Sequence, residues 1–170
     1  MAAAPTYSKT HRALHWATVG LMLMVFPVGV FISDVPGEGT SALGVANSAI
    51  KNFMYDWHKW FGLVILVATA LRLAYKFTHP VAHATDITPM ERTISHVVHV
   101  LLYMMLFGVP LGGWAATNAL GFPIYWFWVI PLPNILPRNP DLGFQLLEMH
   151  QWAAWGLCAL FMAHIGAALM

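Results

Sequence analysis

Histidine is the residue type in this sequence most able to do chemistry, with nine copies beside only eight basic and seven acidic side chains. Six of these histidines lie inside long apolar stretches, where an ionisable group is costly to bury and usually has a bound partner. They are His15, His58, His96, His99, His150 and His164. Because neutral imidazole is a common metal ligand, the placement of these six decides what they can bind.

Four stretches of the chain are long and apolar enough to cross a lipid bilayer as helices, for which about 20 residues are needed. They cover residues 11–32, 57–77, 93–118 and 144–170. The apolar segment between Trp114 and Leu136 contains repeated prolines, which interrupt a helix, so we expect an aromatic loop in the membrane interface. Residues 42–54 are expected to form a short interfacial helix. The sequence therefore predicts an all-α, integral membrane four-helix bundle, with residues 1–170 as one domain.

The composition excludes several classes of protein. Charged residues make up 9% of the chain and apolar residues 59%, whereas soluble domains carry about 25% charged residues. The net charge of +1 and the absence of a basic stripe exclude a nucleic-acid-binding protein. Cys158 is the only cysteine, so an internal disulfide is excluded. The sequence contains no nucleophile–base–acid set and no glycine-rich phosphate loop, so we expect no catalytic residues of those kinds.

Basic residues near the span ends predict the orientation, because they are more frequent on the cytoplasmic side. With alternating spans, one side of the membrane receives Lys9, Arg12, Arg72, Lys76 and Arg92, and the other receives Lys51, Lys59 and Arg138. This bias predicts that both termini are cytoplasmic. The first span begins like a secretory signal, but its core is long and no small-residue cleavage motif follows Ile32, so we expect it to be retained.

The spacing of four histidines places them in two pairs. His150 and His164 are fourteen residues apart in the fourth span, which is about 21 Å along a helix axis and within about 40° of the same face. His15 opens the first span and His58 opens the second, from opposite sides of the membrane. Because successive spans run in opposite directions, His15 shares a level with His164, and His58 shares a level with His150. We expect two facing imidazole pairs, one near each membrane surface.

Two facing imidazoles from different helices can supply both axial ligands of a haem iron, and four-helix bundles bind such cofactors in their cores. We therefore predict two b-type haems, one for each pair. Arg72 supports this prediction, since it is fourteen residues from His58 on the same helix face. A guanidinium at this depth needs an anion, which a haem propionate would supply. The alternative is an arginine that snorkels from a helix end.

The remaining histidines are compatible with more than one role. His96 and His99 lie three residues apart in the first turns of the third span and share a helix face. We expect one of them to hydrogen-bond a propionate or a quinone carbonyl, or to take up protons during quinone reduction. Two alternatives stay open, namely a structural hydrogen bond and iron ligation in a different pairing. His11, at the very start of the first span, and His79 and His83, in the connection after the second, are expected to be solvated surface residues.

Short motifs accompany these histidines. They are His15-Trp16; Trp57-His58 followed by Gly62 and Leu71-Arg72-Leu73; Ser95-His96-Val97-Val98-His99 with Tyr103; Gly108-Val109-Pro110-Leu111-Gly112; and His150-Gln151 with His164. Together they resemble the bacterial cytochrome b561 family of four-helix di-haem proteins, which includes a superoxide:ubiquinone oxidoreductase of the inner membrane. The resemblance covers nearly the whole chain. It implies that His15 and His164 ligate a cytoplasmic haem iron, and that His58 and His150 ligate a periplasmic one.

The resemblance also implies a function in the bacterial inner membrane. The chain would transfer electrons between a quinone pool, such as ubiquinone, and a small redox partner such as superoxide, with Lys51 and Lys59 adding an attraction for the anion on the outer side. Cytochrome b subunits of membrane-bound hydrogenases and formate dehydrogenases share the arrangement. The alternative is therefore an electron-transfer anchor subunit with a redox partner protein on the outer face. A third hypothesis is a haem-free transporter whose histidines relay protons.

Overall fold

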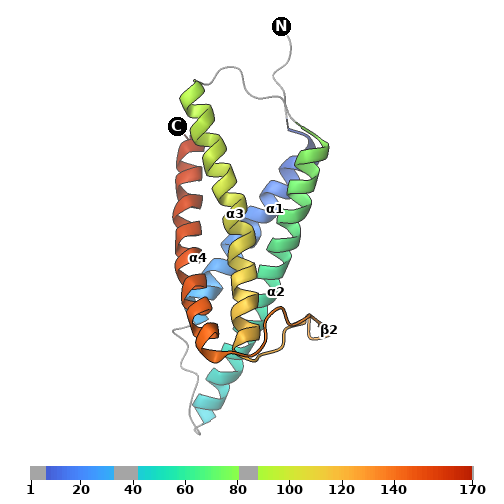
Figure 1. Ribbon diagram of the computed structural model, residues 1–170, viewed down its shortest axis with the longest axis vertical. Helices are drawn as coiled ribbons and strands as arrows, with labels where there is room; N and C mark the ends of the chain where they lie inside the picture. Colours follow the sequence, from blue (N-terminus) through green and yellow to red (C-terminus); the bar gives the residue numbers. More distant parts are fainter. Residues whose placement is uncertain (1–6, 33–41, 81–87, 170) are drawn as a thin grey trace.

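Four long helices make up most of the computed structural model, which describes residues 7–32, 42–80 and 88–169. They are α1 (Lys9–Ile32), α2 (Ala42–Thr78), α3 (Pro89–Ala119) and α4 (Pro140–Leu169). Figure 1 shows successive helices running in opposite directions along one long axis. Each helix contains an apolar window long enough to cross a membrane. The predicted four-helix membrane bundle is confirmed.

The second helix is longer than the sequence led us to expect. Residues 42–54 do not form a short helix of their own but are the first turns of α2, which is continuous from Ala42 to Thr78. No proline occurs between these two residues, so nothing in the sequence ends the helix before the apolar stretch begins. Within α2, residues Ser48–Thr78 are long and apolar enough to span a membrane, and the first turns of the helix extend beyond the bundle (Figure 1).

The two ends of the bundle carry different elements. At one end α1 and α3 begin and α2 and α4 finish (Figure 1), and we call this the terminal end. The start of α3 there is fixed by a capping box, in which Thr88 accepts from the N–H of Glu91 and the Glu91 carboxylate accepts from the N–H of Thr88. The opposite end, where α3 finishes and α4 begins, is called the loop end.

The loop end carries the aromatic connection between α3 and α4. Within it, β1 (Tyr125–Trp126) and β2 (Ile130–Pro131) form a short antiparallel hairpin. Its turn residues Phe127 and Trp128 have φ values of 49° and 59°, a left-handed conformation that costs about 1–2 kcal/mol per residue. Contacts with α2 offset this cost, because the rings of both residues pack on Trp60, at centroid distances of 5.2 and 4.1 Å. The hairpin therefore packs against α2.

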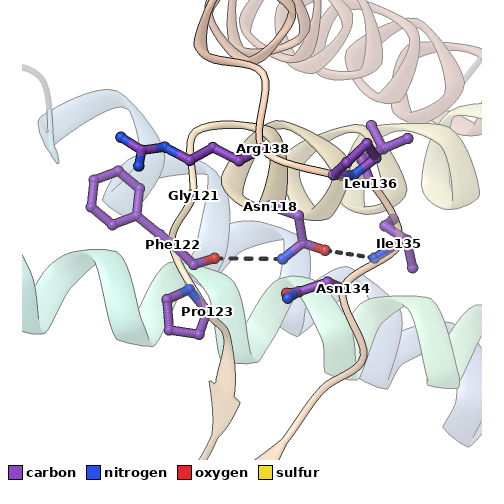
Figure 2. Close-up of a pocket in the computed structure, with 9 residues that line it drawn as sticks. Asn118, Gly121, Phe122, Pro123, Asn134, Ile135, Leu136 and Arg138 are labelled. Carbon is purple, nitrogen blue, oxygen red and sulfur yellow. Dashed lines mark hydrogen bonds between the residues drawn. The ribbon is translucent and has the colours of Figure 1, made fainter.

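Asn118, at the end of α3, holds the two ends of this connection together. Its side chain is 4% exposed; its amide donates to the carbonyl of Phe122 and its oxygen accepts from the N–H of Ile135, at 3.5 and 2.9 Å (Figure 2). Asn118 lines a surface pocket together with Gly121 and Arg138. Gly121 has a φ of +91°, a turn conformation that favours glycine, and the Arg138 side chain lies against it.

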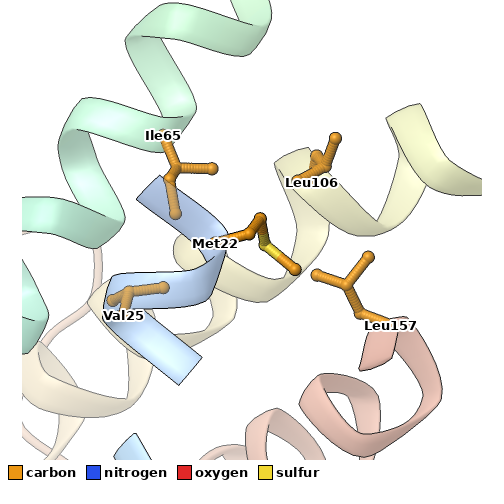
Figure 3. Packing of buried hydrophobic residues seen from close by; sticks show 5 residues of the cluster. All are labelled: Met22, Val25, Ile65, Leu106 and Leu157. Atoms are coloured by element: carbon orange, nitrogen blue, oxygen red, sulfur yellow. The ribbon is translucent and has the colours of Figure 1, made fainter. Parts of the chain in front are cut away.

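An apolar layer crosses the middle of the bundle. All four helices contribute to it, and the side chains are Met22, Val25, Ile65, Leu106 and Leu157. Figure 3 shows them converging between the helices. None of these side chains is more than 9% exposed. Because the layer carries no polar group, it separates the polar residues of the terminal end from those of the loop end.

Candidate functional site

A seven-residue spacing brings one residue of every helix to each of three levels of the bundle. Seven residues rise about 10.5 Å and return within about 20° of the same helix face. From the terminal end to the loop end, the three positions are His15, Met22 and Gly29 on α1; Arg72, Ile65 and His58 on α2; His99, Leu106 and Gly113 on α3; and His164, Leu157 and His150 on α4. The helices thus present two polar levels, which we call the terminal site and the loop site, on either side of the apolar layer.

At the loop site, His58 and His150 face each other, with ring centroids 6.0 Å apart. Each ring is hydrogen-bonded to a neighbouring helix: Nδ1 of His58 lies 3.2 Å from the carbonyl oxygen of Val25, and Nδ1 of His150 lies 2.8 Å from that of Val109. A carbonyl oxygen can only accept, so Nδ1 carries the proton in both rings. The lone pair of each neutral imidazole is therefore on Nε2.

Two glycines make these hydrogen bonds sterically feasible. Gly29 and Gly113 each follow the accepting carbonyl by four residues, at the position whose side chain would lie over that carbonyl in a helix. A Cβ atom on Gly29 would stand 2.6 Å from Cε1 of His58, and one on Gly113 would stand 2.9 Å from Cε1 of His150. Both imidazoles therefore occupy space that only glycine leaves open.

At the terminal site, His15 and His164 face each other with ring centroids 6.4 Å apart. Both line a cavity together with Arg72, His99 and Tyr103. His99 lies 5.1 Å from His164 between ring centroids, and its Nδ1 is 2.6 Å from the carbonyl oxygen of Ser95. The buried Nδ1 of His15 has no hydrogen-bond partner among the described residues. The terminal site is thus more open than the loop site and less fixed by backbone hydrogen bonds.

Arg72 brings a cation to the terminal site. Its guanidinium carbon lies 5.5 Å from the centroid of the Tyr103 ring, and the Lys76 ammonium lies 5.4 Å from the same centroid. The described carboxylates form one salt bridge, between Lys59 and Asp56 at 2.9 Å, and it is near the loop end. The cation in the cavity is therefore available to an anionic group of a bound molecule.

The spacing of each histidine pair fits one iron between two imidazoles. A bond from a metal to imidazole nitrogen is about 2.0–2.1 Å, and a ring centroid lies about 1.1 Å beyond its nitrogen, so two rings on one metal have centroids about 6.3 Å apart. The observed separations are 6.0 and 6.4 Å. Within the described residues, no group of three or more histidine, cysteine or acidic side chains could hold a bare metal ion. Two ligands suit a metal whose remaining ligands come from a macrocycle.

Comparison with known proteins supports the same cofactor. The sequence pattern of a family described as prokaryotic cytochrome b561 matches residues 6–170. The chain belongs to this family. One curated relative, "Cytochrome b561 homolog 2" of Escherichia coli (strain K12), is 23% identical over 165 residues, which cover 93% of this chain and 80% of that protein. The chain is thus a multi-pass membrane protein of a family that transfers electrons across the membrane through b-type haem.

Of the seven site residues predicted from the sequence, six lie at the two sites and one does not. Six of them meet at the two sites described above: His15, Arg72, His99 and His164 at one, and His58 and His150 at the other. His96 is exposed and is not among the residues that line the cavity. The third span therefore presents His99, rather than His96, to the terminal site.

Sequence reasoning missed the residues that orient the histidines. Val25 and Val109 contribute through their carbonyl groups, which no side-chain pattern reveals. Gly29 and Gly113 did carry a signal, because they are fourteen residues from His15 and His99, the same spacing that separates His150 from His164. Read in all four helices, this spacing points to both sites and to His99.

Proposed function

We propose that this cytochrome b561 binds two b-type haems and passes electrons across the membrane between a quinone and a small redox partner. The observation that carries the proposal is the pair of facing imidazoles at each site, His15 with His164 and His58 with His150, at the separation that one iron requires. Bound haem would supply an iron that accepts and releases one electron at a time. One haem at each level would provide an electron carrier near each membrane surface.

The protein contributes binding, orientation and exclusion of water. At the loop site, the carbonyls of Val25 and Val109 fix the ring orientation of His58 and His150 and increase the basicity of Nε2 as a ligand. At the terminal site, the Arg72 guanidinium is placed to pair with a propionate in a charge-assisted hydrogen bond. Between the sites, the apolar layer keeps water and hydrated ions out of the centre of the bundle.

The residues at the terminal end suit a site at which quinone is reduced. His99 donates from Nδ1 to the carbonyl of Ser95, which leaves Nε2 free of that bond. The ring of His99 lines the cavity. Histidine gains and loses protons near neutral pH, which suits a quinone that takes up protons with its electrons. Lys9, Arg12, Lys76 and Arg92 are also at this end, and this charge bias supports our proposal that the terminal end, with both termini, faces the cytoplasm of a bacterial cell.

The small redox partner, for which superoxide is our candidate, would then react at the outer, loop end. The electrostatic attraction expected from Lys59 is weakened, because its ammonium is paired with Asp56. Arg138 is the exposed cation at this end that lies in a surface pocket. Attraction of an anion would therefore depend on Arg138 and Lys51 more than on Lys59.

An anchor subunit for a partner protein is the second candidate function. The observation in its favour is the exposed aromatic hairpin, in which Phe127, Trp128 and Val129 are 53, 61 and 78% exposed. Large exposed aromatic residues at the rim of a protein suit an interface with another protein. A stable complex that survives purification in mild detergent would favour this function.

Stopped-flow absorbance tests the first proposal. Purified protein is mixed with superoxide and then with a ubiquinone analogue, and the haem absorbance is followed. We expect superoxide to reduce the haem and the quinone to reoxidise it, with quinol formed in proportion. Reduction by superoxide without reoxidation by quinone would contradict the assignment of quinone as the acceptor.

A further inference from the structure

A second polar cluster lies at the terminal end, beside the cavity but outside its lining. The Ser8 hydroxyl is 3.0 Å from Nδ1 of His11 and 3.3 Å from the phenol oxygen of Tyr75. The rings of His11 and Tyr75 are in edge contact at 4.6 Å between centroids, and Tyr7 packs on the other side of His11 at 5.6 Å. Ser8 is exposed and Tyr75 is partly exposed. A hydrogen-bonded chain therefore runs from the protein surface to the ring of His11.

His11 is not the solvated residue that the sequence suggested. Its Nε2 is buried and has no hydrogen-bond partner among the described residues, and the same is true of Nδ1 of His15. The two histidines are four residues apart on α1, about 6 Å along the axis and within about 40° of one face. Two hydrogen bonds through one water span about 5.5 Å. Buried polar atoms that lack protein partners are the usual sites of such bridging waters.

We propose that Tyr75, Ser8 and His11 form a proton path from the terminal surface to the cavity at the terminal site. Protons would pass from bulk water along the hydroxyls of Tyr75 and Ser8 to Nδ1 of His11, then from its Nε2 to a water that also contacts Nδ1 of His15. Histidine suits this role because it can be protonated on one ring nitrogen and deprotonated on the other. Three further groups lie near the path without completing it: Tyr7, His79 stacked on Tyr75, and Arg72 in the cavity.

This inference rests on the proposed function, because it needs a quinone that accepts protons beside the haem at the terminal site. Reduction of one quinone to quinol consumes two electrons, which arrive through the protein from the loop end, and two protons. The side chains of the apolar layer offer no hydrogen-bonding group that could pass protons from the loop end. Both protons would therefore come from water at the terminal end, where the series of hydrogen bonds that ends at His11 offers a route.

The test compares two acceptors. Pre-reduced protein is mixed either with a ubiquinone analogue or with ferricyanide, which takes one electron and no proton. His11→Phe keeps a ring of similar size and removes both nitrogens, and His96→Phe changes an exposed histidine at the same end of the bundle. We expect His11→Phe to slow reoxidation by quinone about tenfold or more, with ferricyanide reoxidation, haem content and haem spectrum unchanged. His96→Phe should leave both rates unchanged.

A second variant tests whether structural damage, rather than loss of proton transfer, explains the slower reoxidation by quinone. His11→Ala should also lose quinone reoxidation, and added imidazole should restore part of it by replacing the missing ring. Quinone reoxidation at the wild-type rate in His11→Phe would overturn the proton path. An equal loss with both acceptors would also overturn it, because His11 would then support electron transfer. Failure of quinone to reoxidise the wild-type protein would instead refute the proposed function, and the proton path with it.

Discussion

His58 and His150 are each oriented by a hydrogen bond that crosses from one helix to the next. The acceptors are backbone carbonyls, and each carbonyl is reachable because a glycine stands four residues later. In proteins, metal-binding histidines commonly donate their second nitrogen in this way, which sets the tautomer and the ring plane. The chemistry of the loop site therefore depends on residues that have no functional side chain.

Alanine at position 29 tests this dependence. The new Cβ would stand 2.6 Å from Cε1 of His58, so the ring must move and its hydrogen bond to Val25 is weakened. We expect Gly29→Ala to lose most of the haem at the loop site and to keep the other haem, as measured by the haem absorbance per chain. Gly20→Ala is the matched control on the same helix, because nothing lies within 4 Å of its Cβ. Equal haem content in both variants would show that the imidazole of His58 does not depend on the space left by Gly29.

Arg72 gives the residue-scale prediction for the terminal site. A hydrogen bond to a charged group contributes about 1.5–3 kcal/mol, so Arg72→Gln should weaken haem binding there about 10- to 100-fold. The measurement is haem release to an excess of apomyoglobin, followed by absorbance. Arg138→Gln, which removes an exposed arginine at the loop end, should release haem at the wild-type rate. A wild-type rate in Arg72→Gln would show that the arginine pairs with something else.

At the scale of elements, the connection between α3 and α4 depends on one buried amide. Asn118 bonds to both Phe122 and Ile135 (Figure 2). Asn118→Ala would leave the N–H of Ile135 without this acceptor, which costs about 1–3 kcal/mol. We expect a lower midpoint of thermal unfolding and faster proteolysis within residues 120–139. Asn134→Ala, which alters an exposed residue of the same pocket, should change neither quantity.

The elements differed in how far the sequence predicted them. Hydropathy was sufficient for the four spans, because a bilayer demands a length of apolar helix that few other folds require. The start of α2 was missed, because the segment before Tyr55 lacks both the hydropathy of a span and a residue that would end a helix. The strained turn at Phe127 and Trp128 was not predictable either, since its favourable energy comes from Trp60, which is distant in sequence.

The candidate site was predicted more fully than its surroundings. Fourteen-residue spacing identified His150 with His164 and His58 with Arg72, because helix periodicity converts that spacing into two levels on one face. It left His96 and His99 unresolved, since residues three apart share a face when only one helix is considered. The structure favours His99 because Leu106 and Gly113 continue its face to the other levels. The partners of the ring nitrogens are backbone atoms, so they became visible only in three dimensions.

At the scale of the whole molecule, we propose that the two sites are separate and that each binds one haem. The apolar layer between them (Figure 3) leaves no polar residue that belongs to both. Loss of one histidine should therefore empty one site and leave the other intact. This independence distinguishes two stacked haem sites from a single site shared by all the histidines.

The most direct measurement is the number of haems per chain, from the pyridine haemochrome spectrum and the protein concentration. We expect about two in the wild-type protein, about one in His164→Ala and about one in His58→Ala, with about two retained in His96→Ala. His164→Ala and His58→Ala should each retain a different haem, so the remaining haem absorbance should differ between these two variants. A wild-type protein with one haem or none, or a loss in His96→Ala equal to that in His164→Ala, would contradict the proposal of two separate haem sites.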